Sequence, residues 1–198
     1  KLSEQLGGFA GQLTENAIKK IEIEFEGQVA QVNTQPLMQT IICSLLKSNF
    51  DGVNVINSIV VAKNKSIQIS ETKHEKVGEY QSCVTLTIET DKQTRSVTGT
   101  LFGGKPRIVN IKGIKIEAEL SKYNLYISNE DKPGFISNLS KILADNSINI
   151  ATFNLGRKNT GGEAIALLST DNAIEEKVID SIKKIPLVIQ AKTLTFDE

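Results

Sequence analysis

The chain has 198 residues, enough for one large domain or two small ones. Its 23 Lys and Arg residues balance 23 Asp and Glu residues, so it lacks the basic field that attracts nucleic acid. Its apolar runs are all shorter than the ~20 residues that span a bilayer, and its two isolated cysteines favour a reduced, cytoplasmic protein over a disulfide framework. We therefore expect neither nucleic acid nor a membrane as a partner.

The first residues predict a helix followed by a half-buried strand. Leu2, Leu6, Phe9 and Leu13 recur at helical spacing. The segment "KKIEIEFEG" then alternates between apolar residues and glutamates, which is typical of a strand with one wet face. One wet face in turn indicates an antiparallel sheet.

The following segments complete a first α+β domain. In "TQPLMQTIICSLLKSN", Thr34 is placed to cap a helix and Pro36 suits its first turn. The stretch "VINSIVVAKNKSIQISETK" predicts two short strands around a turn at residues 63–66. Residues 79–120 predict a β-meander with turns at "TDKQT", "FGGKP" and "IKGI". Residues 1–120 are thus expected to form an antiparallel-sheet α/β sandwich.

Residues 121–198 predict a second domain with a different rhythm. Its elements follow the order β-α-β-β-α-β, which is the ferredoxin-like split βαβ arrangement. The strands are "YNLYISN", "INIATFNLGR", "EAIALLST" and "PLVIQAKTLTF", and the helices are "PGFISNLSKILADN" and "DNAIEEKVIDSIKKI". Asp171 or Asn172 is placed to cap the second helix.

The sequence offers no catalytic or metal-binding constellation. His74 is the only histidine and lies in a charged stretch that predicts a solvated loop. Cys43 and Cys83 lie in apolar elements, which predicts buried structural thiols. Neither paired metal-ligand spacing nor a complete nucleotide-binding glycine motif occurs.

A weak candidate for an anion site is "GGKPRIVNIKG". Lys105 and Arg107 follow paired glycines at a strand edge, and glycine amides with two cations are able to receive a phosphate or carboxylate. The alternative is a charged edge strand that is protected against pairing with other strands.

A stronger candidate is "NEDKPG" together with Asn149. We expect Pro133 to begin a helix and Gly134 to permit a close approach, with Asp131 as a cap if no ligand binds. The βαββαβ order is expected to bring Asn129, Asp131 and Asn149 to one sheet edge. A carboxylate accepts from an ammonium and amides pair with a carboxylate, so these residues suit a small zwitterion such as an amino acid.

Both halves of the chain resemble known regulatory modules. "ISNEDKPGFISNLSKILADNSINIATFNLGR", followed by "GGEAIALLSTD", resembles the ACT domain, an amino-acid-binding regulatory module. "LGGFAGQLTENAIKKIEIEFEGQVA", "TQPLMQTIICSLL" and "VTGTLFGGKPRIVNIKGIKIEAEL" resemble the intervening, or allosteric substrate-binding, domain of long-form D-3-phosphoglycerate dehydrogenases. The resemblance covers the whole chain and has both modules in the expected order.

The resemblance implies a binding site and an assembly. In that family L-serine binds between ACT domains as an allosteric feedback inhibitor, and the matching positions are Asn129, Asp131 and Asn149, with Pro133 and Gly134 in the same turn. An ACT–ACT dimer, and a tetramer built from it, is the implied homo-oligomer. The intervening domain binds anions near the positions of Lys105 and Arg107.

The resemblance also implies that catalysis lies elsewhere. The NAD-dependent dehydrogenase chemistry of the family resides in an upstream domain whose fingerprint and catalytic histidine do not occur in this sequence. The first residue, Lys1, is not an initiator Met, so we expect a regulatory fragment that by itself binds no cofactor and is not an enzyme. Two alternatives are the regulatory beta region of an iron–sulfur L-serine dehydratase and an assembly module without a ligand.

Overall fold

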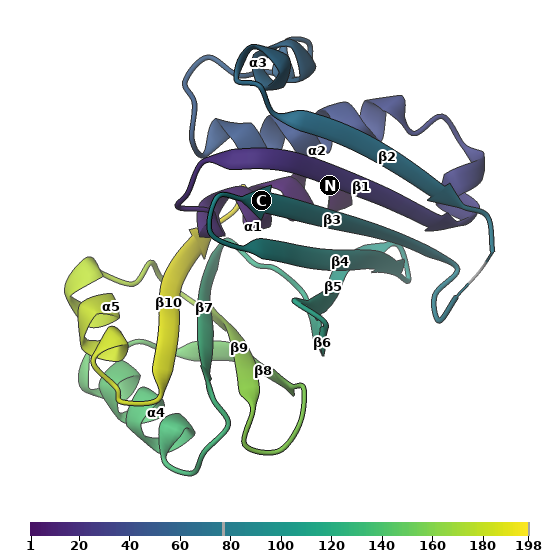
Figure 1. Cartoon of the computed structure of the whole chain (residues 1–198). Coiled ribbons are helices and arrows are strands. Elements are labelled where there is room, and N and C mark those ends of the chain that lie inside the picture. Colours follow the sequence, from purple (N-terminus) through teal and green to yellow (C-terminus); the bar gives the residue numbers. More distant parts are fainter. Residues whose placement is uncertain (77, 198) are drawn as a thin grey trace. The chain divides into compact units, whose positions relative to one another are not determined.

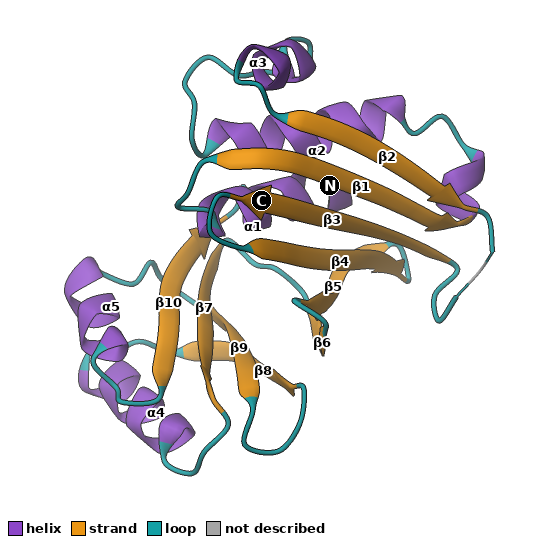
Figure 2. Cartoon of the chain, in the orientation of Figure 1, coloured by secondary structure: helices purple, strands orange, loops and turns teal. Residues whose placement is uncertain are grey.

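The computed structural model describes residues 1–76 and 78–197. The chain forms two compact units, Lys1–Lys112 and Gly113–Glu198. The division falls in a turn at Lys112 and Gly113, whereas the sequence predicts it after Leu120. Each unit has its own sheet and its own helices (Figures 1 and 2).

The first unit is a sheet with helices packed on one face (Figure 1). Its strands have the spatial order β2-β1-β3-β4-β5. The strands are β1 (Ile18–Gly27), β2 (Gln68–His74), β3 (Ser82–Thr90), β4 (Thr94–Phe102) and β5 (Lys105–Ile111). The helices are α1 (Leu2–Leu13), α2 (Gln35–Lys47), α3 (Ser58–Asn64) and the short 3₁₀ helix η1 (Gln28–Gln31).

The alternation in β1 has the predicted consequence. Ile21, Ile23 and Phe25 are buried beneath the helices, while the glutamates between them face the other side. Helices α1 and α2 pack closely because α1 has glycine where the two backbones approach each other. A Cβ atom on Gly7 would lie 2.2 Å from the carbonyl oxygen of Ile41, so only glycine fits there.

The prediction of a wholly antiparallel sheet is wrong at one edge. The segment expected to form two strands forms helix α3 and strand β2, and β2 runs parallel to β1. Helices α2 and α3 carry the chain back to the end at which β1 begins, and a strand that follows such a return must be parallel. The sheet is therefore mixed.

Several local predictions for the first unit also have outcomes. Thr34 is the N-cap residue of α2, as predicted, but its hydroxyl donates to Glu71 Oε1 and makes no capping hydrogen bond, while Pro36 does lie in the first turn. His74 is solvent-exposed as expected, but it ends strand β2 and does not lie in a loop. Cys43 and Cys83 are buried free thiols, as predicted.

The second unit has the predicted βαββαβ order, with one short strand before it. The strands are β6 (Ile114–Ala118), β7 (Tyr123–Glu130), β8 (Ile150–Arg157), β9 (Glu163–Thr170) and β10 (Val188–Thr195). The helices α4 (Phe135–Asp145) and α5 (Glu176–Lys183) lie on one side of a four-stranded antiparallel sheet with the order β10-β7-β9-β8 (Figure 1). Strands β8 and β10 are thus its edges.

An aliphatic core holds the helices of the second unit on their sheet. Leu125 and Ile127 of β7 pack against Leu139 and Leu143 of α4 and against Ile182 of α5, and all five are at most 1% exposed.

The predicted cap of α5 is wrong. The helix begins after Glu175, and the Asp171 carboxylate instead accepts a hydrogen bond from Asn149.

The described residues contain no helix that is long and apolar enough to cross a membrane. They also contain no group of three or more His, Cys, Asp or Glu side chains able to hold a metal ion.

Candidate effector site

The turn between β7 and α4 is held in place from both sides. The Glu130 N–H donates to the Leu187 carbonyl at 2.9 Å, and the Asp131 N–H donates to the Gly162 carbonyl at 2.8 Å. Leu187 precedes β10 and Gly162 precedes β9, so the two neighbouring strands of β7 fix the backbone of this turn. The side chains of residues 129–131 therefore begin from a well-defined position.

The Asp131 carboxylate is bound by the β8–β9 hairpin. Its Oδ2 accepts hydrogen bonds from Arg157 Nη1 at 2.9 Å and from the Gly161 N–H at 3.2 Å. The hydrogen bond from Arg157, and then the one from Gly161, hold the pKa of Asp131 below its usual range. Asp131 does not cap α4, and it is an anion at neutral pH.

The predicted start of helix α4 is wrong by two residues. The helix begins at Phe135, so Pro133 lies before it, and Gly134 is its N-cap with φ of 98°. That backbone conformation favours glycine. A Cβ at Gly134 would have open space around it, so glycine is needed there for its φ and not for a close contact within this chain.

The start of α4 leaves donors free for an anion. In the described part of the chain no side chain caps this helix. The first N–H groups of an α-helix have no partner within the helix, and they carry the positive end of the helix dipole.

Asn129 carries a buried acceptor next to this turn. The residue is 2% exposed, and its Nδ2 donates to the Glu130 carbonyl at 2.8 Å. Its Oδ1 is buried, and none of the described residues donates a hydrogen bond to it. Buried polar atoms are nearly always paired, so a donor from outside the chain, either a water molecule or a ligand, is expected to reach this oxygen.

Asn149 does not join the other candidates within one chain. Ile150 is paired with Thr170 at one end of β9, whereas Arg157 is paired with Ala164 and Ala164 with Asn129 at the other. Because β7 and β8 are both antiparallel to β9, they are parallel to each other, and α4 returns the chain along the whole sheet. Asn149 therefore lies about 20 Å from the Asp131 turn. The expectation that they converge in one chain is wrong.

The "GGKPR" segment of the first unit has a simpler local explanation. Phe102 pairs with Lys105 across a two-residue loop in which Gly103 has φ of 56° and Gly104 has φ of 80°. Two positive φ angles define a type I′ hairpin turn, which accounts for both glycines. An anion site at Lys105 and Arg107 stays a prediction.

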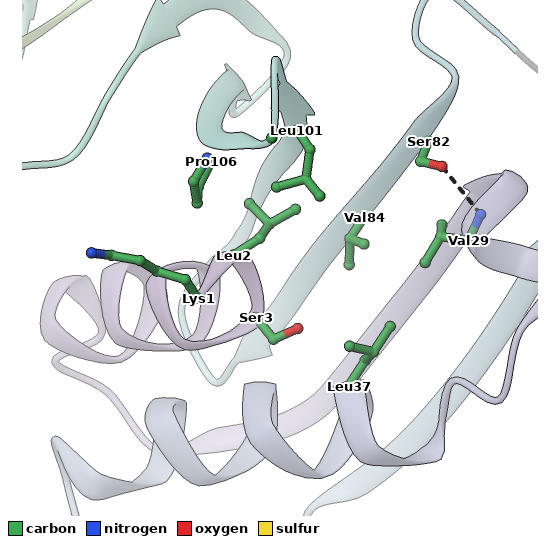
Figure 3. A pocket seen from close by; sticks show the side chains of 10 residues that line it. Lys1, Leu2, Ser3, Val29, Leu37, Ser82, Val84, Leu101 and Pro106 are labelled. Carbon is green, nitrogen blue, oxygen red and sulfur yellow. Dashed lines mark hydrogen bonds between the residues drawn. The ribbon is translucent and has the colours of Figure 1, made fainter.

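A cavity of about 410 Å³ lies beside that hairpin in the first unit (Figure 3). Its wall is largely apolar, with Leu2, Leu37, Val84 and Pro106 among the residues that line it. Lys105 and Arg107 do not line this cavity, so the cavity is not part of the predicted anion site.

The fold and the turn together define a class of protein. Residues 123–187 match the family model of the ACT domain, and residues 1–112 match that of the D-3-phosphoglycerate dehydrogenase intervening domain. The chain is thus a two-domain region of regulatory modules. It belongs to the D-3-phosphoglycerate dehydrogenase intervening-domain family, followed by an ACT domain, as the sequence resemblance predicts.

Relatives of two kinds match nearly the whole chain. D-3-phosphoglycerate dehydrogenase of Bacillus subtilis is 32% identical over 98% of this chain, and that of Methanocaldococcus jannaschii is 32% identical over 93%. The chain spans only 37% and 35% of the length of these two relatives. A probable L-serine dehydratase beta chain of Bacillus subtilis is 25% identical over 94% of this chain, which spans 86% of that relative.

Two residues of the site were missed from the sequence. Arg157 and Gly161 both bind the Asp131 carboxylate, yet neither stands near it in the chain. Strands β7 and β8 are parallel, so their last residues lie at the same end of the sheet. This rule would have placed Arg157 near Asp131.

Proposed function

We propose that this chain is the regulatory region of a D-3-phosphoglycerate dehydrogenase of L-serine biosynthesis and binds L-serine as an allosteric feedback inhibitor. One observation carries the proposal: an ionised carboxylate, Asp131, and the buried Asn129 acceptor occupy a rigid turn at the start of α4. The NAD-dependent chemistry belongs, in this proposal, to the rest of the parent enzyme.

The turn suits both charges of an amino acid. The Asp131 carboxylate is able to accept from the ligand's ammonium group, and the first N–H groups of α4 are able to donate to its carboxylate. The Asn129 acceptor adds a place for a further donor, such as the serine hydroxyl or the ammonium. These are single hydrogen-bonding groups, which suits a small ligand.

Pairing of two copies supplies the role of Asn149. Strand β8 is an edge of its four-stranded sheet, so we expect the β8 strands of two copies to pair as antiparallel neighbours about a two-fold axis. In such a pair the Ile150 end of one strand lies against the Arg157 end of the other. Asn149 of one copy then approaches the Asp131 turn of the other, and each dimer has two equivalent sites.

Regulation follows from a site shared between chains. A ligand held by two copies favours the quaternary arrangement in which both of its walls are present, by the difference between its affinities for the two arrangements. The intervening domain would transmit that preference to the catalytic domains of the parent enzyme. We expect a dimer through β8, and a tetramer in the complete enzyme.

Calorimetric titration with L-serine tests binding, with D-serine and L-alanine as comparison ligands. We expect heat from L-serine, weaker binding of the other two, and loss of binding in both Asp131→Asn and Asn149→Ala. Absence of L-serine heat with an intact dimer would instead support the assembly module without a ligand.

Mixing the two inactive variants tests whether the site is shared. In a heterodimer of Asp131→Asn and Asn149→Ala chains, one site carries both substitutions and the other carries neither. We therefore expect binding to return in the mixture with at most one site per heterodimer. If both homodimers stay inactive and the mixture does too, Asn149 and Asp131 do not meet across the interface.

The dehydratase alternative rests on length, because the chain spans 86% of the probable L-serine dehydratase beta chain. The coding sequence upstream of Lys1 separates the two proposals. A continuous reading frame with a dinucleotide-binding glycine motif supports the dehydrogenase, and a start codon adjoining Lys1 supports a separate beta chain.

A further inference from the structure

We propose that Arg157 is a positioning residue of the effector site, which orients the Asp131 carboxylate so that its second oxygen faces the ligand's ammonium group. This inference rests on the proposed function of the turn and goes beyond it by assigning a role to the β8–β9 hairpin. Arg157 itself is not proposed to contact the ammonium.

The hydrogen-bond pattern carries the inference. Both donors, Arg157 Nη1 and the Gly161 N–H, bind the same oxygen, Oδ2. None of the hydrogen bonds within the described residues ends on the other oxygen of Asp131. Two donors on one oxygen fix the plane of the carboxylate and leave Oδ1 as an acceptor of known direction, which is the preorganisation that a binding site needs.

The position of Arg157 on the fold gives this arrangement a further use. Arg157 is the last residue of β8, the edge strand through which two copies are proposed to pair. Pairing would hold the end of β8 in place and, through Arg157, the carboxylate of Asp131. Ligand affinity is therefore expected to depend on the same strand that carries the interface.

The ion pair is well suited to act on binding and not on folding. The side chains of Arg157 and Asp131 are 56% and 21% exposed, and ion pairs of this exposure contribute little to folding stability. Replacing Arg157 is therefore expected to leave a folded chain in which binding can be measured. The backbone bond from Gly161 remains in that variant.

The charged residues around Asp131 determine which variant is a suitable control. The other charged residues of the turn and hairpin are Glu130, Lys132, Lys158 and Glu163. Glu130 forms an ion pair with Lys132, and Glu163 accepts a hydrogen bond from Ser128. Lys158 is exposed and adjoins Arg157, so Lys158→Met removes the same charge from the same hairpin without touching Asp131.

The experiment measures L-serine affinity against pH in the wild type, Arg157→Met, Arg157→Lys and Lys158→Met. We expect Arg157→Met to weaken binding on the order of tenfold, the scale of a lost charge-assisted hydrogen bond, and Lys158→Met to change it by less than about twofold. Arg157→Lys should restore part of the affinity. The pH below which binding fails should rise in Arg157→Met, because Asp131 then protonates more easily.

Opposite results overturn the proposal. Tighter binding in Arg157→Met would make Arg157 a competitor of the ammonium group, and an unchanged affinity with an unchanged pH profile would give it no role in binding. If the wild type itself binds no L-serine, both proposals fail. If the wild type binds L-serine and the Arg157 variants bind it with the same affinity, the proposed function stands and only this inference fails.

The pKa of Asp131 in the absence of ligand tests the role of Arg157 independently of serine binding. The Asp131 carboxyl carbon is followed by NMR through an acid titration of the wild type and of Arg157→Met. We expect its pKa to rise towards the usual range in the variant. An unchanged pKa would show that Arg157 does not hold this carboxylate in solution.

Discussion

The β4–β5 turn of the first unit and the β7–α4 turn of the second combine the same residue types: glycine, proline and charged side chains. In the β4–β5 turn, each glycine is accounted for by the two positive φ angles of a tight hairpin. In the β7–α4 turn, one glycine is accounted for by the N-cap of α4, yet the buried acceptor of Asn129 receives no hydrogen bond from the described chain.

The difference shows what separates a structural turn from a candidate site. Residue types alone do not separate the two, because both turns contain residues that suit an anion or a zwitterion. The second turn differs because other elements organise its polar groups: β9 and β10 fix its backbone, and Arg157 of β8 fixes its carboxylate. Convergence of several elements on one polar group is characteristic of binding sites.

Alanine at the glycine of each turn tests this comparison with the largest expected effect. Gly104 has φ of 80° and Gly134 has φ of 98°, and both have open space where a Cβ would lie. Each Gly→Ala variant should therefore lose about 1–2 kcal/mol of unfolding free energy through backbone strain alone. Only Gly134→Ala should also weaken L-serine binding, because Gly134 sets the start of α4.

Asparagine at the same two positions is the matched control, since asparagine tolerates a positive φ better than alanine. Chemical denaturation and calorimetry should show that it recovers part of the stability at both sites. An equal loss of serine affinity at Gly104 and Gly134 would erase the distinction between the two turns.

A smaller effect is expected from buried polar groups. Asn129→Leu removes the buried Oδ1 together with one hydrogen bond to the Glu130 carbonyl. These changes oppose each other, so the unfolding free energy without ligand should change by less than about 1 kcal/mol, while serine binding should weaken. In the first unit the buried Thr100 hydroxyl donates to the Ser82 carbonyl, so Thr100→Val should cost about 1 kcal/mol.

Denaturant titration of both variants, with and without L-serine, checks this pair. Asn129→Leu should lose the stabilisation that serine gives to the wild type, whereas Thr100→Val should keep it. A large loss of stability in Asn129→Leu without ligand would mean that Oδ1 is satisfied in solution by water, and that the buried acceptor is no sign of a ligand.

The second unit followed from its sequence because each element has a clear local period. Its helices show apolar stripes, its strands are rich in β-branched residues, and glycine-containing turns separate them. In the first unit, α3 was missed because its seven residues are too few to show a helical period and include Ile59, Val60 and Val61, which favour strands. The parallel edge was missed because a crossover is a property of the whole sheet.

The expected convergence of Asn149 and Asp131 within one chain is wrong for a topological reason. The βαββαβ order is expected from the sequence to bring Asn149 and Asp131 to one end of the sheet, but in a β-α-β unit the second strand starts beside the start of the first. The same rule separates Asn149 from Asp131 and joins Arg157 to Asp131. Whether Asn149 reaches the turn of a second copy depends on a partner chain, which the sequence of one chain does not place.

Near neutral pH the smallest effect is that of titration, to which the two units should respond at opposite ends of the pH scale. The hydrogen bonds from Arg157 and Gly161 lower the pKa of Asp131, so its contribution to stability is present above the usual aspartate pKa and is lost as the pH falls through the lower folded value. Burial, and then the nearby Glu26, raise the pKa of Cys83 to about 11. Its contribution is therefore present below the usual thiol pKa and is lost as the pH rises through about 11.

Denaturant unfolding across the pH range separates these two responses when Asp131→Asn and Cys83→Ala are compared with the wild type. Asp131→Asn should flatten the stability profile only in acid, and by a small amount, because its ion pair with Arg157 is largely exposed. Cys83→Ala should flatten it only above the usual thiol pKa. If Asp131→Asn also changed the unfolding free energy at alkaline pH, the carboxylate would be interacting with groups other than Arg157 and Gly161. That result would weaken the case that the hairpin alone positions it.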